Sequence, residues 1–212
     1  MTSFRYKNED EDEDEKEEQE EKKEKQEKGA GPLGEKLLIK GRTILLFGEI
    51  NQKVAQDISA KLLLLAQESD DDIKLYINSP GGHVESGDTI HDMIRFVKPR
   101  VKVIGTGWVA SAGALIFVAT PRELRYCLQN TRFMLHQPSG GVGGQATDIS
   151  IEAQEILKMR QRLNELFARE TGQPLSRIEK DTDRNFWMSA VEAREYGLVN
   201  HIVMSSVELD NI

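Results

Sequence analysis

Short runs of β-branched and other apolar residues alternate with amphipathic stretches along this chain, and this alternation constrains the fold more than any other feature. Strands are predicted at residues 43–48, 73–78 and 101–106, because these runs are short and rich in Val, Ile and Leu. Helices are predicted between them, at 51–67 and 89–97, where apolar residues recur at helical spacing. A chain with this alternation is expected to form an α/β domain in which helices pack on a sheet.

The second half of the chain continues the pattern with shorter elements. The expected elements are a helix at 111–119, strands at 124–128, 133–137 and 199–203, and short helices near 175–181 and 191–196. One longer helix is predicted at 147–171 and ends at Thr171-Gly172, a C-cap signal. Its charged residues lie beside an apolar stripe that includes Ile151, Leu157, Leu163 and Phe167. Such a helix either covers the core or packs against another subunit, and both interpretations stay open.

The net charge of −8 is concentrated at the start of the chain. Residues 1–28 hold 13 acidic and seven basic side chains, whereas the remaining 184 residues hold 23 and 21. The first segment has almost no apolar residues, so it is expected to be a disordered acidic tail. Residues 29–34 follow as a linker, which leaves one folded domain at 35–212. The tail is either a solvating segment or an arm that gates the protein or binds a partner.

Composition also excludes several classes of protein. The chain has no basic patch, so a nucleic-acid partner is not expected. It has no signal peptide and no apolar run near 18 residues, so no membrane association is expected. Its one cysteine, Cys127, permits no intramolecular disulfide, which suits a reducing compartment and predicts a cytoplasmic location. No metal or cofactor is expected.

Ser111 stands at the join between a predicted strand and a predicted apolar helix. At that join its hydroxyl lies near free helix N–H groups, which favour negative charge. The small neighbours Ala110, Ala112 and Gly113 would let a substrate backbone approach closely. Serine is also a common helix N-cap, so this feature alone does not establish a catalytic role.

A nucleophilic serine needs a base and N–H donors for the oxyanion. His136 is the preferred base, because it ends a strand and precedes Gln137-Pro138. His83, directly after Gly82, is a rival, while His91 and His201 lie within a helix and a strand and are expected to be structural. Ala112 and Gly82 are the candidate oxyanion donors. The predicted substrate-binding segment, an exposed strand edge or a flexible loop, is Ser139, Gly140, Gly141 and Val142.

Five segments in this order resemble the Clp protease proteolytic subunit family, ClpP. They are NSPGG at 78–82, ASAGA at 110–114, MLHQP at 134–138, GQATDI at 144–149, and the stretch from Ser189-Ala190 to Tyr196-Gly197-Leu198. The resemblance runs from about residue 37 to residue 203. It implies the α/β ClpP/crotonase-like fold with a protruding handle helix at 147–171. It also implies a barrel of two stacked heptameric rings, a tetradecamer.

The resemblance further implies an activity and the residues that carry it. The expected activity is that of a serine endopeptidase, which degrades unfolded polypeptides delivered by an AAA+ unfoldase such as ClpX, ClpA or ClpC. By position, Ser111 is the nucleophile and His136 the general base. Gly82 and Ala112 form the oxyanion hole. Asp183 and Arg184 match a charged pair that the family uses between its rings.

The chain departs from the family pattern at the third catalytic position. The family has Asp after the charged pair, whereas this chain has Asn185. Asparagine can accept a hydrogen bond from histidine but supplies no charge, so activity is expected to be low for the chain alone. Asp181 and Asp183 lie nearby as possible substitutes. The segment before the first strand is also short, which puts docking of the unfoldase in question.

Two functions from different classes therefore stay open, with the active endopeptidase preferred. The alternative is an inactive or weakly active subunit that completes a mixed barrel with a ClpP paralogue, which Asn185 favours. Retention of Ser111, His136 and the glycine donors favours the active enzyme. A crotonase-type acyl-CoA enzyme is a remote third, because that class needs no serine–histidine pair.

Overall fold

The computed structural model describes residues 31–138 and 143–210, which divide into two units between Gly41 and Arg42. The first unit contributes helix α2 (Gly31–Lys40), none of whose residues is buried. This helix includes residues 31–34, which the sequence assigns to a linker. Pro32 is compatible with a helix at this point, because the first turn makes no use of its missing N–H.

The second unit is built on a mixed sheet. Its described residues form seven strands: β1 (Thr43–Phe47), β2 (Ile73–Ser79), β3 (Val101–Ala110), β4 (Arg125–Leu128), β5 (Arg132–Leu135), β6 (Phe186–Ser189) and β7 (His201–Val203). The order is β1-β2-β3-β4-β7, and β5 pairs with β3 and β6. All of these pairs are parallel except β5 with β6. The α/β fold class is confirmed.

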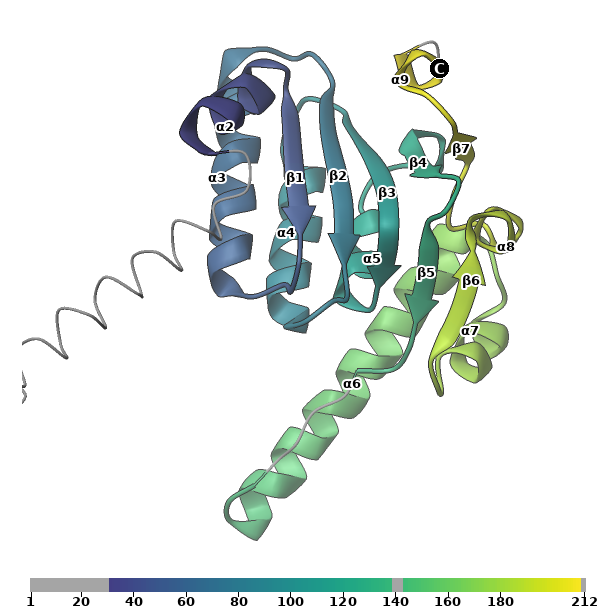
Figure 1. Cartoon of the computed structure of the whole chain (residues 1–212). Helices are drawn as coiled ribbons and strands as arrows, with labels where there is room; N and C mark the ends of the chain where they lie inside the picture. Colours follow the sequence, from purple (N-terminus) through teal and green to yellow (C-terminus); the bar gives the residue numbers. More distant parts are fainter. Residues whose placement is uncertain (1–30, 139–142, 211–212) are drawn as a thin grey trace, which may run out of the picture. The chain divides into compact units, whose positions relative to one another are not determined.

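Strand β3 divides its pairing between two neighbours, and this division places the site. Its residues Val103–Gly105 pair with β4, whereas Trp108–Ala110 pair with β5. Because β3 and β5 are parallel, their carboxyl ends lie side by side (Figure 1). The residues that follow, Ser111 and His136, therefore leave the sheet at the same edge.

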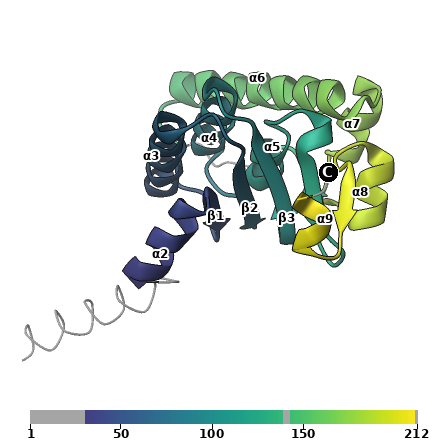
Figure 2. The same cartoon turned by 90° about the horizontal axis from the view of Figure 1, so that it is seen from above.

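Three helices cover one face of the sheet: α3 (Gln52–Glu68), α4 (Val84–Phe96) and α5 (Ala112–Phe117) (Figure 2). Helix α3 begins where the Asn51 side chain accepts the Val54 N–H at 3.0 Å, an N-cap. Helix α4 begins five residues before the predicted start. Ser86 and Gly87 are poor helix formers, but both are buried here, and packing against α5 outweighs their intrinsic preference.

Helix α6 (Ala146–Thr171) has a packed half and a free half in this chain. Its C-terminal part buries Leu163, Leu166 and Phe167. Its N-terminal part extends beyond the sheet (Figure 1) and leaves Ile151 and Leu157 53% and 62% exposed. The helix ends at Gly172, as predicted. The C-terminal half therefore covers the core, as one interpretation expects, and the exposed N-terminal half is available to pack against another subunit, as the other expects.

The buried Arg125 fixes the packed end of α6 to the core. Its guanidinium pairs with the Glu170 carboxylate and donates to the carbonyl oxygens of Val118 and Thr120. The remaining helices are η1 (Arg122–Leu124), α7 (Leu175–Asp181), α8 (Ala190–Tyr196) and α9 (Ser206–Asp210). Among the helices formed by residues 31–138 and 143–210, none combines the length and apolar character needed to cross a membrane.

Candidate active site

Ser111 occupies a strained turn between β3 and α5. Its backbone has φ 55° and ψ −123°, a conformation that non-glycine residues rarely adopt. The turn is held by the Ser111 N–H, which donates to the Met134 carbonyl at 2.9 Å, and by the Ala114 N–H, which donates to the Ser111 carbonyl. A strained strand-to-helix turn of this kind presents a serine hydroxyl at the edge of a sheet.

The structure brings Ser111 and His136 into direct contact. The Nε2 atom of His136 lies 2.7 Å from the Ser111 Oγ, and both side chains are half-buried. His136 directly follows the last residue of β5, so the strand carries the ring to the serine. The distance suits transfer of the hydroxyl proton to the imidazole.

Asn185 hydrogen-bonds to the same imidazole from the loop before β6. Because Nε2 faces the serine, Nδ1 is the ring nitrogen that is open to Asn185. Burial lowers the pKa of His136, since a charged ring is poorly solvated there, and the Asn185 bond partly opposes this by raising it. An amide oxygen that accepts a ring N–H has that effect. His136 is therefore neutral near pH 7 and able to accept a proton.

Of the two glycines after β2, Gly81 lies against the serine and Gly82 lies against Ile50. A Cβ atom at Gly81 would come within 2.5 Å of the Ser111 Cβ, and one at Gly82 would come within 2.2 Å of the Ile50 carbonyl oxygen. The Gly81 carbonyl and the His83 N–H pair with Ile50, so this bridge does not use the Gly82 N–H. Ala112 opens α5, where the first N–H groups have no partner within the helix.

Two of the predicted residues have different partners from those the sequence suggests. The Asp183 carboxylate accepts from Arg160 of α6 at 3.2 Å and the Asp181 carboxylate from Tyr196 at 2.9 Å. Neither carboxylate acts on His136: in the described part of the chain, the groups that set its pKa include no acid. Neither aspartate therefore replaces the missing acid. Arg184 is exposed.

The remaining candidates are accounted for within the described residues or lie outside them. Ser139, Gly140, Gly141 and Val142 lie outside, so the predicted strand edge is not described. His83 contacts Glu85 and Ser86 rather than Ser111, His91 is buried on α4, and His201 stacks on Tyr126. Sequence reasoning did not assign a role to Gly81, although the consecutive glycines of the NSPGG motif carried that signal.

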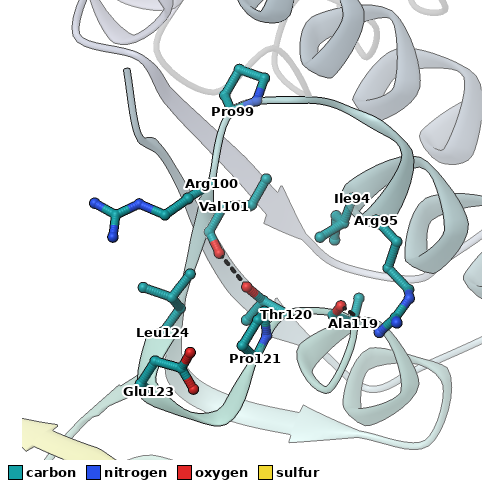
Figure 3. A pocket seen from close by; sticks show the side chains of 10 residues that line it. All are labelled: Ile94, Arg95, Pro99, Arg100, Val101, Ala119, Thr120, Pro121, Glu123 and Leu124. Atoms are coloured by element: carbon teal, nitrogen blue, oxygen red, sulfur yellow. Dashed lines mark hydrogen bonds between the residues drawn. The ribbon is translucent and has the colours of Figure 1, made fainter. Parts of the chain in front are cut away.

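A separate pocket of about 330 Å³ lies between the end of α4, the start of β3 and residues 119–124 (Figure 3). Its arginines already have partners: Arg100 holds Asp72 through two bonds, and Arg95 donates to the Ala119 carbonyl. The pocket includes neither Ser111 nor His136. In the described ranges, no three His, Cys, Asp or Glu side chains gather as metal ligands would.

Comparison with known proteins identifies related chains. The profile of the Clp protease family matches residues 32–206. The ATP-dependent Clp protease proteolytic subunit 3 of Rhizobium johnstonii is 61% identical over 181 residues, which cover 84% of this chain and 93% of that protein. Subunit 2 of Gluconobacter oxydans is 63% identical over 177 residues, or 82% and 79% of the two chains.

Solved structures agree with these relatives. ClpP1 from Listeria monocytogenes is 55% identical with a TM-score of 0.75, and an asparagine-to-aspartate mutant of the same protein gives 0.77. Each match covers 82% of this chain and 98% of the other.

Proposed function

Because this chain belongs to the Clp protease family, we propose that it is a serine-type endopeptidase with Ser111 as nucleophile and His136 as general base. The observation that carries the proposal is the 2.7 Å contact between the Ser111 Oγ and the His136 Nε2 in a strained strand-to-helix turn. His136 takes the hydroxyl proton as Oγ attacks the scissile carbonyl, and later gives it to the leaving amine. Asn185 holds the ring in the tautomer that leaves Nε2 free to accept.

The backbone supplies the oxyanion hole in this proposal. In it, the N–H groups of Gly82 and Ala112 donate to the oxygen that becomes negative in the tetrahedral intermediate. Gly81 makes room for this arrangement, since a Cβ there would collide with the nucleophile. Ser139, Gly140, Gly141 and Val142 are proposed to bind an extended polypeptide along its backbone.

The proposed working form is an assembly of two heptameric rings that receives unfolded polypeptide from a partner AAA+ unfoldase. Apolar side chains left open on this chain support contacts between copies: Phe47 and Trp108 on the sheet are 52% and 44% exposed. Ile151 and Leu157 on the free half of α6 add to them. Asp183 and Arg184 are proposed to lie at the contact between rings. Residues 1–34 are proposed to be an acidic tail and linker that precede the protease domain, and the location is proposed to be cytoplasmic.

One observation favours a second function, that of a weakly active subunit in a barrel shared with a paralogue. Asn185 accepts the ring hydrogen bond but cannot neutralise the imidazolium that forms during attack. A paralogue with an acid at this position would then supply most of the cleavage.

The test is degradation of an unfolded, fluorescently labelled casein by the assembled protein, alone and with an AAA+ unfoldase. Wild type is expected to release peptides and Ser111→Ala to release none, with the same elution on a sizing column. Cleavage by Ser111→Ala at the wild-type rate would remove Ser111 from the mechanism. An assembled wild type without activity, which gains activity when mixed with a paralogue, would favour the second function.

A further inference from the structure

Gln137, the residue after His136, is bonded to the loop that carries Asn185. Its backbone N–H donates to the Thr182 carbonyl at 2.6 Å. Its side-chain Nε2 donates to the Asp183 carbonyl at 2.8 Å and approaches the Asp183 carboxylate at 3.4 Å. Gln137 therefore binds two consecutive loop residues, Thr182 and Asp183, to the end of β5.

The same loop residues are anchored on their other side by α6. The Thr182 hydroxyl donates to the Asn164 Oδ1 at 2.9 Å, and both side chains are buried. Arg160 reaches the Asp183 carboxylate at 3.2 Å. Residues 182–183 are thus held between β5 and α6.

Asn185 lies between two fixed points of this arrangement. On one side, Phe186 pairs with Leu135 in the β5–β6 ladder. On the other side, Asp183 is bonded to Gln137, so only Arg184 and Asn185 bridge the gap. The Asn185 side chain is exposed. Its hydrogen-bond partner, His136, is half-buried. Packing around Asn185 does not fix it, so its position depends on the bonds at both ends of the bridge.

We propose that Gln137 is a positioning residue, whose side-chain amide fixes the 182–185 loop and thereby holds Asn185 against His136. The proposal rests on the proposed function, because it assigns Gln137 a role in activating Ser111. A positioning role differs from a general structural role in one respect: replacing Gln137 should lower the reactivity of Ser111 only when Asn185 is present.

The test is a double-mutant cycle on the assembled full-length protein, with Gln137→Ala, Asn185→Ala and the combined variant. The first readout is the rate at which a fluorophosphonate labels Ser111. Loss of one hydrogen bond that orients a catalytic group predicts a fall of about five- to tenfold for Gln137→Ala. In the Asn185→Ala background the same change should have an effect of less than about twofold, because the residue to be positioned is gone.

The second readout does not depend on activity. The pH titration of the His136 ring, followed by its 13Cε1 resonance, is expected to move to lower pH in Gln137→Ala, because the Asn185 bond that raises its pKa is weakened. Asn185→Ala should give the same shift, and the combined variant no more. The matched control is Gln161→Ala, an exposed glutamine on α6 that bonds to Glu165 and should change neither readout.

Two results would overturn the proposal. An unchanged titration and labelling rate in Gln137→Ala would show that the amide does not fix Asn185. An equal fall in labelling with and without Asn185 would show that Gln137 acts by another route. Labelling of Ser111→Ala at the wild-type rate would instead refute the proposed function, while the titration would still decide the role of Gln137.

Discussion

Replacement of Asn185 by aspartate places a negative charge beside the His136 ring, and Coulomb's law gives the order of magnitude of the gain. The carboxylate and the imidazolium would be about 4 Å apart across one hydrogen bond, which gives about 4 kcal/mol at an effective dielectric constant of 20. Because Asn185 is exposed, solvent screening weakens the interaction, and its energy lies between about 2 and about 4 kcal/mol. The expected acceleration of acylation is therefore about 30- to 1,000-fold.

The assay is single-turnover labelling of Ser111 by a fluorophosphonate, followed across pH 5.5–9. The new carboxylate raises the pKa of His136, so the midpoint of the rate profile should move to higher pH than in wild type. The gain is therefore read from the plateau above the midpoint, where the ring is neutral in both proteins. Asn130→Asp, in the turn between β4 and β5, adds the same charge at an exposed site away from Ser111 and should leave the rate unchanged.

An Asn185→Asp protein that elutes as the same assembly but labels no faster than wild type at the plateau would contradict this estimate. That result would mean that lost charge does not limit the reaction. A faster plateau without a shift of the midpoint would also contradict the account, because the charge would then act elsewhere than on His136.

Three further predictions concern stability and assembly. Glu170→Ala leaves the buried Arg125 guanidinium without its carboxylate, so the free energy of unfolding is expected to fall by about 3 kcal/mol, or roughly 6–12 °C in Tm by calorimetry. The control is Glu155→Ala, which removes an exposed acid from the same helix. A loss for Glu170→Ala no larger than that of the control would contradict this. Burial lowers the pKa of His91 below 6.5, so the unfolded chain takes up the proton first and stability should fall as pH drops below about 6.5. His91→Gln should therefore lose less Tm between pH 7.5 and 5.5 than wild type, and parallel curves would exclude this origin. Arg184→Ala leaves the Arg160–Asp183 pair intact and is expected to shift the protein to smaller species on a sizing column; an unchanged elution would argue against a contact between rings.

The fold was largely predictable, because its signals are local. Apolar runs and helical spacing predicted the central strands and helices, and Thr171-Gly172 marked the end of α6. The errors occurred where tertiary packing outweighs local preference. The start of α4 at Val84 depends on burial of Ser86 and Gly87, which no pattern within that segment indicates. Strand β6 is four residues long and exists through its antiparallel pairing with β5.

The site was predictable in its residues but not in its supports. Ser111 and His136 were found by context and by resemblance, and their contact required the parallel pairing of β3 with β5. Gln137 bonds to residues 45 and 46 positions further along the chain, so no local sequence pattern indicates these contacts. The hydrogen bond from the Tyr196 hydroxyl to the Asp181 carboxylate likewise depends on where α7 and α8 lie.

The most direct test of the account is the intact mass of the protein after brief reaction with a fluorophosphonate, with the adduct located by peptide mapping. Wild type is expected to acquire one adduct per chain, on Ser111, and both Ser111→Ala and His136→Ala are expected to acquire none. An assembled wild-type protein that acquires no adduct, or one that is modified at another residue, would contradict the central claim that Ser111 is an activated nucleophile.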